Sequence, residues 1–170
     1  MITKRAFVLW FCGGLVAFAI AIWLHLPLSV EGVPAGITEH QSAPDAATVN
    51  AIHAAWQAAG VYDQARIAMI SDLIFIGIYG IGCVLGGLYY RASARAVLKA
   101  LGWIALASGI VFLITDYGET IAQFMQLSAG AGDDTLANIA SSLRPFKVLT
   151  WISAFLSLVL ALLIERFARA

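Results

Sequence analysis

Long apolar runs separated by shorter polar segments dominate the chain. A run of about 20 apolar residues, each rising ~1.5 Å in a helix, crosses ~30 Å of hydrocarbon. Four runs reach that length, at residues 6–26, 68–90, 97–124 and 148–164. These runs fill most of the 170 residues. The pattern predicts a single domain, an all-α integral membrane protein whose four transmembrane helices form an antiparallel bundle.

The first connection between spans, an outer loop at residues 27–67, divides into two parts. Its first half contains Pro and Gly and shows no periodicity, so we expect irregular loop there. In the second half apolar residues recur at helical spacing: Val49, Ile52, Trp56 and Ala59. This spacing predicts an amphipathic helix at about residues 44–59, with Ser42 or Asp45 near its cap. The helix should lie on the membrane surface or cover the bundle.

The second outer connection repeats this scheme on a smaller scale. Asp133 or Asp134 can cap a short amphipathic helix that contains Leu136 and Leu143. Pro145 follows and is expected to begin the last helix, because proline is tolerated in a first helical turn. The inner connection, between residues 90 and 97, is short and basic, which favours a tight helical hairpin.

The composition agrees with a membrane protein. Hydrophobic residues make up 61% of the chain and charged residues only 12%, whereas an ordinary soluble domain is about a quarter charged. The first span follows Lys4 and Arg5, as in a signal peptide, but its apolar run exceeds the usual length for one and no convincing cleavage site follows. We therefore expect a retained helix.

The basic residues are distributed unequally between the two sides of the predicted spans. One side has seven of them: Lys4, Arg5, Arg91, Arg95, Lys99, Arg166 and Arg169. The other side has Arg66, Arg144 and Lys147. Because cytoplasmic loops are enriched in Lys and Arg, both termini are predicted to be cytoplasmic. The protein would then be a multi-pass protein of the inner (plasma) membrane with periplasmic or extracellular outer loops. No basic surface is large enough to bind nucleic acid.

Three carboxylates lie inside the predicted spans. Asp72 lies ~6 Å within the outer boundary at ~1.5 Å per residue, and Asp116 reaches the same depth when counted from the other side. Glu119 is the i+3 neighbour of Asp116 and therefore shares its helix face. Ionisable groups in hydrocarbon are unfavourable unless they face a partner or a cavity, so they mark candidate functional sites.

Polar, small and aromatic residues continue the faces of these carboxylates. The expected ligand-binding residues are Asp72, Tyr79, Phe112, Asp116, Glu119, Gln123 and Trp151. The candidates for general acid–base catalysis are Asp72, Asp116, Glu119 and His25. Whether the site only binds a molecule or also hydrolyses it is left open by the sequence.

Two other interpretations of the acidic cluster stay open. The three acids could form a purely structural ring of ion pairs with Arg66, Arg144 and Lys147, which lie on the same side. They could also bind a metal together with a histidine, although no Glu-x-x-His or His-x-x-x-His spacing supports this. We expect no metal site and no cofactor.

The histidines and cysteines exclude two classes of membrane protein. A b-type cytochrome needs axial histidines on facing helices, and only His25 belongs to a span. His40 and His53 are expected to be solvated in the outer loop. Cys12 and Cys83 lie in cytoplasmic halves of their helices without Cys-x-x-Cys spacing, which excludes a disulfide-forming membrane protein.

The four-span layout with two aspartates at one level resembles that of the lipoprotein signal peptidases. The motifs of that family, Gly-Gly-x-x-Gly-Asn with Asp-Arg and Asn-x-Ala-Asp, do not occur in this chain. Asp72 lies in ISDLIFIGIYG and Asp116 in LITDYGETIAQ. The chain is therefore not assigned to the family. A proton-sharing aspartyl pair is still physically possible, because two carboxylates within ~3 Å hold one proton near neutral pH.

The leading functional prediction is an acidic pocket at the outer leaflet that binds, and could process, an amphiphilic or lipid-like small molecule. The alternative is a non-catalytic accessory subunit of a membrane complex. Gly82 and Gly86 form a G-x-x-x-G step, which would allow close packing within the bundle or in a homo-oligomer. A proton-coupled transporter is a third possibility, but the cytoplasmic half lacks the ionisable residues that would complete a proton path.

Overall fold

The computed structural model describes residues 2–167 of the chain, and the long elements in this part are all helices. Four helices in it are long and apolar enough to cross a membrane. They are α1 (Lys4–His25), α4 (Tyr62–Arg91), α5 (Ala96–Ala129) and α6 (Asp134–Phe167). This confirms the prediction of an all-helical, multi-pass membrane protein. α4, α5 and α6 extend beyond the apolar runs that predicted them, mainly at the loop end of the molecule.

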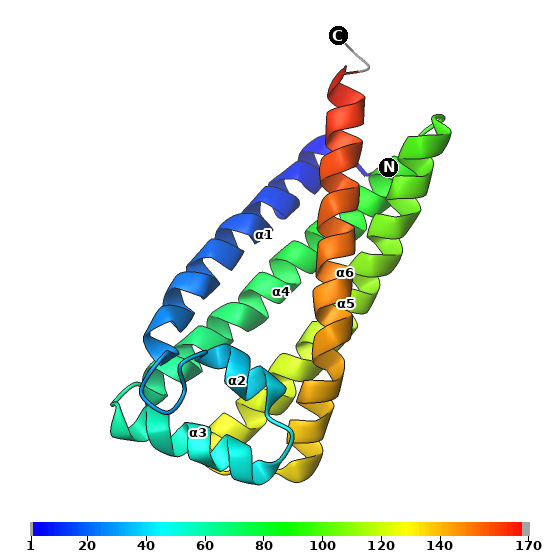
Figure 1. Cartoon of the computed structure of the whole chain (residues 1–170). Helices are drawn as coiled ribbons and strands as arrows, with labels where there is room; N and C mark the ends of the chain where they lie inside the picture. The colour runs from blue at the N-terminus through cyan, green and yellow to red at the C-terminus, as the bar shows by residue number, and fades with distance from the viewer. Residues whose placement is uncertain (1, 168–170) are drawn as a thin grey trace.

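The long helices lie side by side in chain order (Figure 1). α1 packs along α4, α4 along α5, and α5 along α6. One end of the molecule, here called the terminal end, holds the start of α1, the end of α6 and the turn at residues 92–95. The opposite end, the loop end, holds α2 (Ile37–Ser42) and α3 (Ala46–Ala58).

Side-chain caps fix several helix ends. Thr3 accepts a hydrogen bond from the Ala6 N–H at the start of α1, and Asp45 accepts one from Thr48 at the start of α3. Asp133 accepts the Leu136 N–H at 2.9 Å and so caps α6. Each cap pairs a backbone donor that lacks a partner within its helix. Gly130, with a φ of 69°, ends α5 in the left-handed conformation that favours glycine.

The prediction for the second outer connection is wrong. We expected a separate short helix and a new start at Pro145, but α6 runs without a break from Asp134 to Phe167 and contains Pro145. The cap at Asp133 begins the helix directly after a short turn. Proline removes one backbone hydrogen bond, yet α6 continues through it in contact with α5.

The first half of the outer loop also differs from the prediction. Where irregular loop was expected, the chain forms the 3-10 turn Leu26–Leu28, a short bridge between Val30 and Val33, and α2. The Glu39 carboxylate accepts a hydrogen bond from the Ala35 N–H at 2.8 Å, which stabilises the first turn of α2. A helix of six residues is too short to produce a detectable hydrophobic period.

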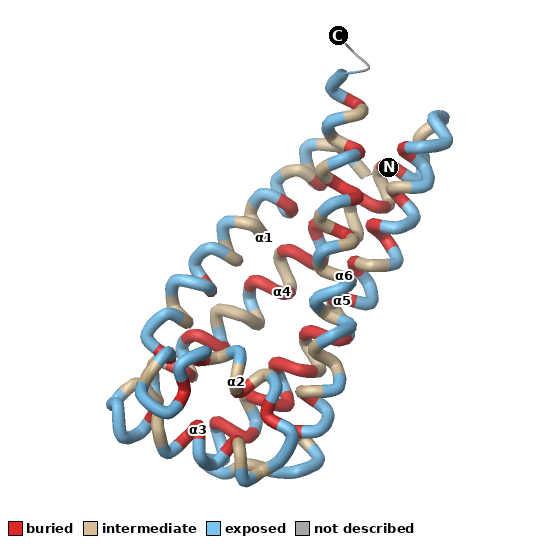
Figure 2. The backbone as a smooth tube through the Cα atoms, viewed as in Figure 1, coloured by how far each residue is buried: buried red, intermediate tan, exposed pale blue. Residues whose placement is uncertain are grey.

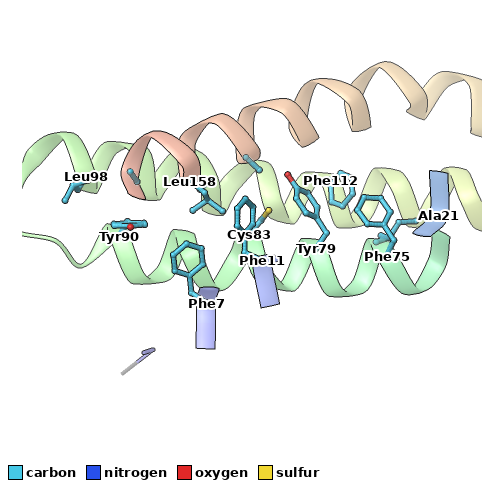
Figure 3. Packing of buried hydrophobic residues seen from close by; sticks show 14 residues of the cluster. Phe7, Phe11, Ala21, Phe75, Tyr79, Cys83, Tyr90, Leu98, Phe112 and Leu158 are labelled. Atoms are coloured by element: carbon cyan, nitrogen blue, oxygen red, sulfur yellow. The ribbon is translucent and has the colours of Figure 1, made fainter. Parts of the chain in front are cut away.

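Buried residues recur along the long helices, while much of α1 is exposed (Figure 2). Aromatic residues fill the middle of this space, among them Phe11, Tyr79 and Phe112 (Figure 3). A second core lies at the loop end beneath α3. Its Trp56 is fully buried and donates its indole N–H to the Leu28 carbonyl at 2.9 Å. Trp56 therefore anchors α3 to the core of the loop end.

The predicted G-x-x-x-G step lies inside the molecule. A Cβ atom on Gly82 would stand 2.7 Å from the backbone nitrogen of Phe11 on α1, and one on Gly86 would meet Leu158 of α6 and Phe7 of α1. Both glycines therefore permit close helix contacts within one chain. These contacts belong to the packing of α4 against α1 and α6.

Candidate ligand-binding site

Two of the three carboxylates that were predicted to lie within the spans line one cavity near the loop end. The cavity has a volume of about 230 Å³ and receives side chains from all four long helices and from α2. Asp72 of α4 and Asp116 of α5 supply its acidic groups, and Lys147 of α6 its ammonium group. The other lining residues are Phe18, Gln41, Phe75, Phe112, Val148 and Trp151.

Lys147 organises the carboxylates on the α5 side. Its ammonium nitrogen lies 3.1 Å from Asp116 Oδ1 and 2.9 Å from Glu119 Oε1, and all three side chains are almost completely buried. Gln123 donates a hydrogen bond to the same Glu119 oxygen at 3.3 Å. Charge-assisted hydrogen bonds of this kind compensate the desolvation of buried ions.

The expected ring of ion pairs is therefore only partly formed. Arg66 lies 3.2 Å from Asp63 on its own helix, at an exposed position, and its guanidinium stacks on Tyr62. It does not contact the cluster in the described structure. One lysine pairs with two of the three acids, and Asp72 is the carboxylate that this lysine does not contact within salt-bridge distance.

Asp72 instead faces His25, the last residue of α1. Asp72 Oδ2 lies 3.9 Å from His25 Nε2, which is too far for a hydrogen bond. The other ring nitrogen, Nδ1, lies 2.7 Å from the Ala21 carbonyl oxygen. Asp72 and His25 also line a second cavity of about 270 Å³, which shares Phe18 and Gln41 with the first.

Aromatic rings form the apolar part of the first cavity. The Phe18 ring of α1 lies 5.2 Å from that of Trp151 on α6 and 5.0 Å from that of Phe75 on α4. Phe112 of α5 packs edge-on against Phe75 at 6.1 Å, and Figure 3 shows both rings beside Tyr79. The indole N–H of Trp151 is buried and has no acceptor among the described residues.

The structure divides the predicted ligand-binding residues into two groups. Four of them line the first cavity: Asp72, Phe112, Asp116 and Trp151. The other three lie around it. Tyr79 is buried in the aromatic core and donates its hydroxyl to the Trp151 carbonyl at 3.1 Å, while Glu119 and Gln123 lie behind Lys147. Of the catalytic candidates, Glu119 lines neither cavity, and His25 lines only the second.

Sequence reasoning missed four important lining residues. Phe75 stands three positions after Asp72 and Phe18 stands seven before His25, so both share helix faces with predicted residues and could have been found by spacing. Lys147 was expected to be one of three equivalent cations. Gln41 comes from α2, in a segment without hydrophobic periodicity, so no sequence pattern indicated that it would line the cavity.

The prediction that His40 and His53 are solvated is wrong. Both side chains are buried at the loop end, where their Nε2 atoms lie 3.1 Å apart in a hydrogen bond. Their rings also contact Trp56, and that of His53 contacts Tyr62 edge-on. Burial, and then the charge of His53, lowers the pKa of His40 to about 3. Burial lowers the pKa of His53 to about 4. Trp56, three positions after His53 on α3, and Tyr62 at the start of α4 shield these rings, which a count of loop histidines does not reveal.

Within residues 2–167 no three His, Cys, Asp or Glu side chains come together in a way that could hold a metal ion. The metal interpretation therefore gains no support from the geometry. Comparisons with protein-family models, curated proteins and solved structures found no match to this chain. The function must accordingly be argued from the cavity itself.

Proposed function

We propose that this protein binds an amphiphilic, lipid-like molecule in the cavity between Asp72 and Trp151. The observation that carries the proposal is one cavity, reached by all four long helices, that joins carboxylates to a wall of aromatic rings. Binding sites for small molecules are typically apolar cavities with a few convergent polar groups. Here the aromatic wall would receive the apolar part of the ligand, and the charged groups its head group.

The proposal includes an orientation in the membrane. We place the chain in the inner (plasma) membrane as an antiparallel four-helix bundle with both termini in the cytoplasm, because most Lys and Arg residues lie at the terminal end. The loop end is then periplasmic or extracellular. The cavity would lie at the outer leaflet, near the level of lipid head groups.

The arrangement of α1 and α6 supports entry from the lipid. These two helices pack less closely on each other than the other neighbouring pairs, and they meet through aromatic pairs such as Phe18 with Trp151. α2 contacts both α5 and α6 at the loop end and supplies Gln41 to the cavity. Rotation of aromatic side chains between α1 and α6 would open the cavity toward the bilayer without separating the main helix contacts.

Binding is the activity that the geometry supports, and catalysis is a weaker extension of it. Asp116 and Glu119 already form ion pairs with the ammonium group of Lys147. Asp72 and His25 are the pair that could still exchange protons with a bound molecule or a water. A hydrolytic reaction would have to use them, because Asp116 and Glu119 would need to break their ion pairs first.

The test is native mass spectrometry of the protein extracted gently from its membrane. We expect a copurified amphiphile on the wild type and on Asp63→Asn, and its loss from Asp72→Asn. Asp63 is the matched control because it lies on the same helix but is exposed and outside both cavities. A wild type without any bound molecule, or equal retention by Asp72→Asn, would contradict the proposal.

A further inference from the structure

The tautomer of His25 is fixed by the backbone. Its Nδ1 lies 2.7 Å from the Ala21 carbonyl oxygen, which can only accept a hydrogen bond. Nδ1 must therefore carry a hydrogen, and in a neutral ring Nε2 is left as a bare acceptor. This Nε2 atom is buried and has no hydrogen-bond partner in the part of the chain that the structure describes.

When the ring is neutral, two acceptors thus face each other without a donor between them among the described residues. Nε2 of His25 and Oδ2 of Asp72 are 3.9 Å apart. For a nitrogen donor placed at the usual ~2.8 Å from both atoms, the angle at the nitrogen between the two acceptors would be about 90°. This angle is close to the tetrahedral separation of two N–H bonds, so one nitrogen can satisfy both acceptors at once.

The charge of the surrounding site favours a cationic donor. Three carboxylates, Asp72, Asp116 and Glu119, stand against the ammonium of Lys147 and the guanidinium of Arg144, whose charge also acts on Glu119. This leaves one formal negative charge when His25 is neutral. An anionic head group would be repelled by this field. Phe18 lines both cavities and Phe75 lines the first cavity together with Asp72, and the faces of their rings can stabilise a neighbouring cation.

We propose that Asp72 and His25 bind a primary or secondary ammonium group, and that the ligand of the cavity is an amine-bearing amphiphile. This inference rests on the proposed function. A quaternary ammonium group carries the same charge but has no N–H, so it would leave His25 Nε2 buried and unpaired. The site should therefore distinguish an amine from its trimethylated analogue, which electrostatic attraction alone would not do.

The experiment compares two probes of equal chain length, octylamine and octyltrimethylammonium, with octanol as the uncharged reference. Binding is measured on the full chain in phosphatidylcholine nanodiscs from the fluorescence of its tryptophans, and empty nanodiscs correct for partitioning. We expect octylamine to bind about tenfold more tightly than octyltrimethylammonium, the effect of one hydrogen bond to a charged group.

Variants assign this preference to the two residues. His25→Phe should abolish the preference by weakening octylamine alone, whereas His25→Gln, whose amide oxygen can replace Nε2, should retain part of it. Asp72→Asn should weaken both cations and leave octanol unchanged. Asp63→Asn should behave as wild type. The wild-type comparison between the two cations decides the inference even where a variant does not fold.

The outcomes separate this inference from the function on which it rests. Equal binding of the two cations would show that water or no ligand occupies the gap, and would overturn the ammonium assignment while leaving amphiphile binding intact. Binding of octanol as tightly as octylamine would also overturn it. Failure of all three probes to bind above the empty nanodisc would contradict the proposed function.

Discussion

At the scale of single residues, the charge balance of the site depends on Lys147. Its ammonium group lies within 3.1 Å of two buried carboxylates, Asp116 and Glu119. Replacing it by methionine would leave both acids buried without a cation. We therefore expect Lys147→Met to lower the free energy of unfolding by about 3–5 kcal/mol. Asp116→Asn should lower it less, by about 1–3 kcal/mol, because Lys147 keeps Glu119.

Chemical denaturation of the detergent-solubilised protein measures both effects. Arg66→Met is the matched control, since Arg66 forms an exposed ion pair with Asp63, and such pairs contribute only about 0–1 kcal/mol. If Lys147→Met is no more destabilising than Arg66→Met, the buried ion pairs do not hold α5 and α6 together.

A second residue-scale prediction concerns the pH dependence of stability. The folded-state pKa values of His40 and His53, about 3 and about 4, lie below the ~6.5 of an unfolded chain. Between these values the unfolded chain binds protons that the folded chain does not. The free energy of unfolding should therefore fall as the pH drops below ~6.5, on the order of 2 kcal/mol for each histidine at pH ~5.

Melting curves at pH 7.5 and pH 5 test this, with the double variant His40→Gln/His53→Gln as comparison. Glutamine keeps hydrogen-bonding capacity but does not titrate in this range. The wild type should lose more thermal stability on acidification than the double variant does. The same loss in both proteins would show that other groups cause the acid sensitivity.

At the scale of the helices, adjacent glycines on α1 have different roles. A Cβ atom on Gly14 would stand 2.5 Å from the Cα of Tyr79 on α4, whereas one on Gly13 would meet only an Ile78 methyl at 3.6 Å. Gly14→Ala should therefore force α1 away from α4, whereas Gly13→Ala should be neutral or stabilise by up to about 1 kcal/mol through helix propensity.

The two alanine variants are compared by thermal unfolding in the same detergent. Their side chains and sequence neighbourhood are nearly identical, so a difference in melting temperature reports the contact with α4. We expect Gly14→Ala to lower the melting temperature. The corresponding loss in free energy of unfolding should be the one typical of overpacking, about 1–3 kcal/mol. Equal melting temperatures would mean that α1 is less tightly packed against α4 than the structure shows.

The helices also show what a sequence pattern can predict. The four spans were predictable because each is a long apolar run, and length alone sets this signal. The continuation of α6 through Pro145 was not, because it depends on packing against α5 and not on local propensity. α2 was missed for a different reason. It is a short helix held by contacts with α3, α5 and α6, which no local pattern encodes.

At the scale of the whole molecule, the candidate site was predictable only in part. Asp72 and Asp116 were found because charged groups are rare in apolar runs, and their common depth followed from the helical rise. The choice of Lys147 over Arg66 as the partner of Asp116 depends on the relative rotation of α6 and α4. Helix rotation is determined by packing, and glycines such as Gly87, whose Cβ would meet the Leu106 backbone, fix it between α4 and α5. A single sequence does not give that packing in advance.

The orientation in the membrane gives the last prediction. Both chain ends and the turn at residues 92–95 belong to the basic terminal end, and α2 belongs to the opposite end. If positive residues stay in the cytoplasm, a reporter active only there should work when fused after Arg169 or inserted between Arg91 and Arg95. A reporter active only outside should work when inserted near Glu39.

The three fusion sites check one another. The sites after Arg169 and between Arg91 and Arg95 must report the same side of the membrane, and the site near Glu39 must report the opposite side. The reversed pattern would place Asp72 and His25 at the inner leaflet. The cavity would then meet lipids and solutes of the cytoplasmic side, and its affinity for an amine-bearing amphiphile would serve a different pool of molecules. Activity of both reporter types at one site would instead indicate two orientations, as expected if the three basic residues Arg66, Arg144 and Lys147 offset the excess at the terminal end.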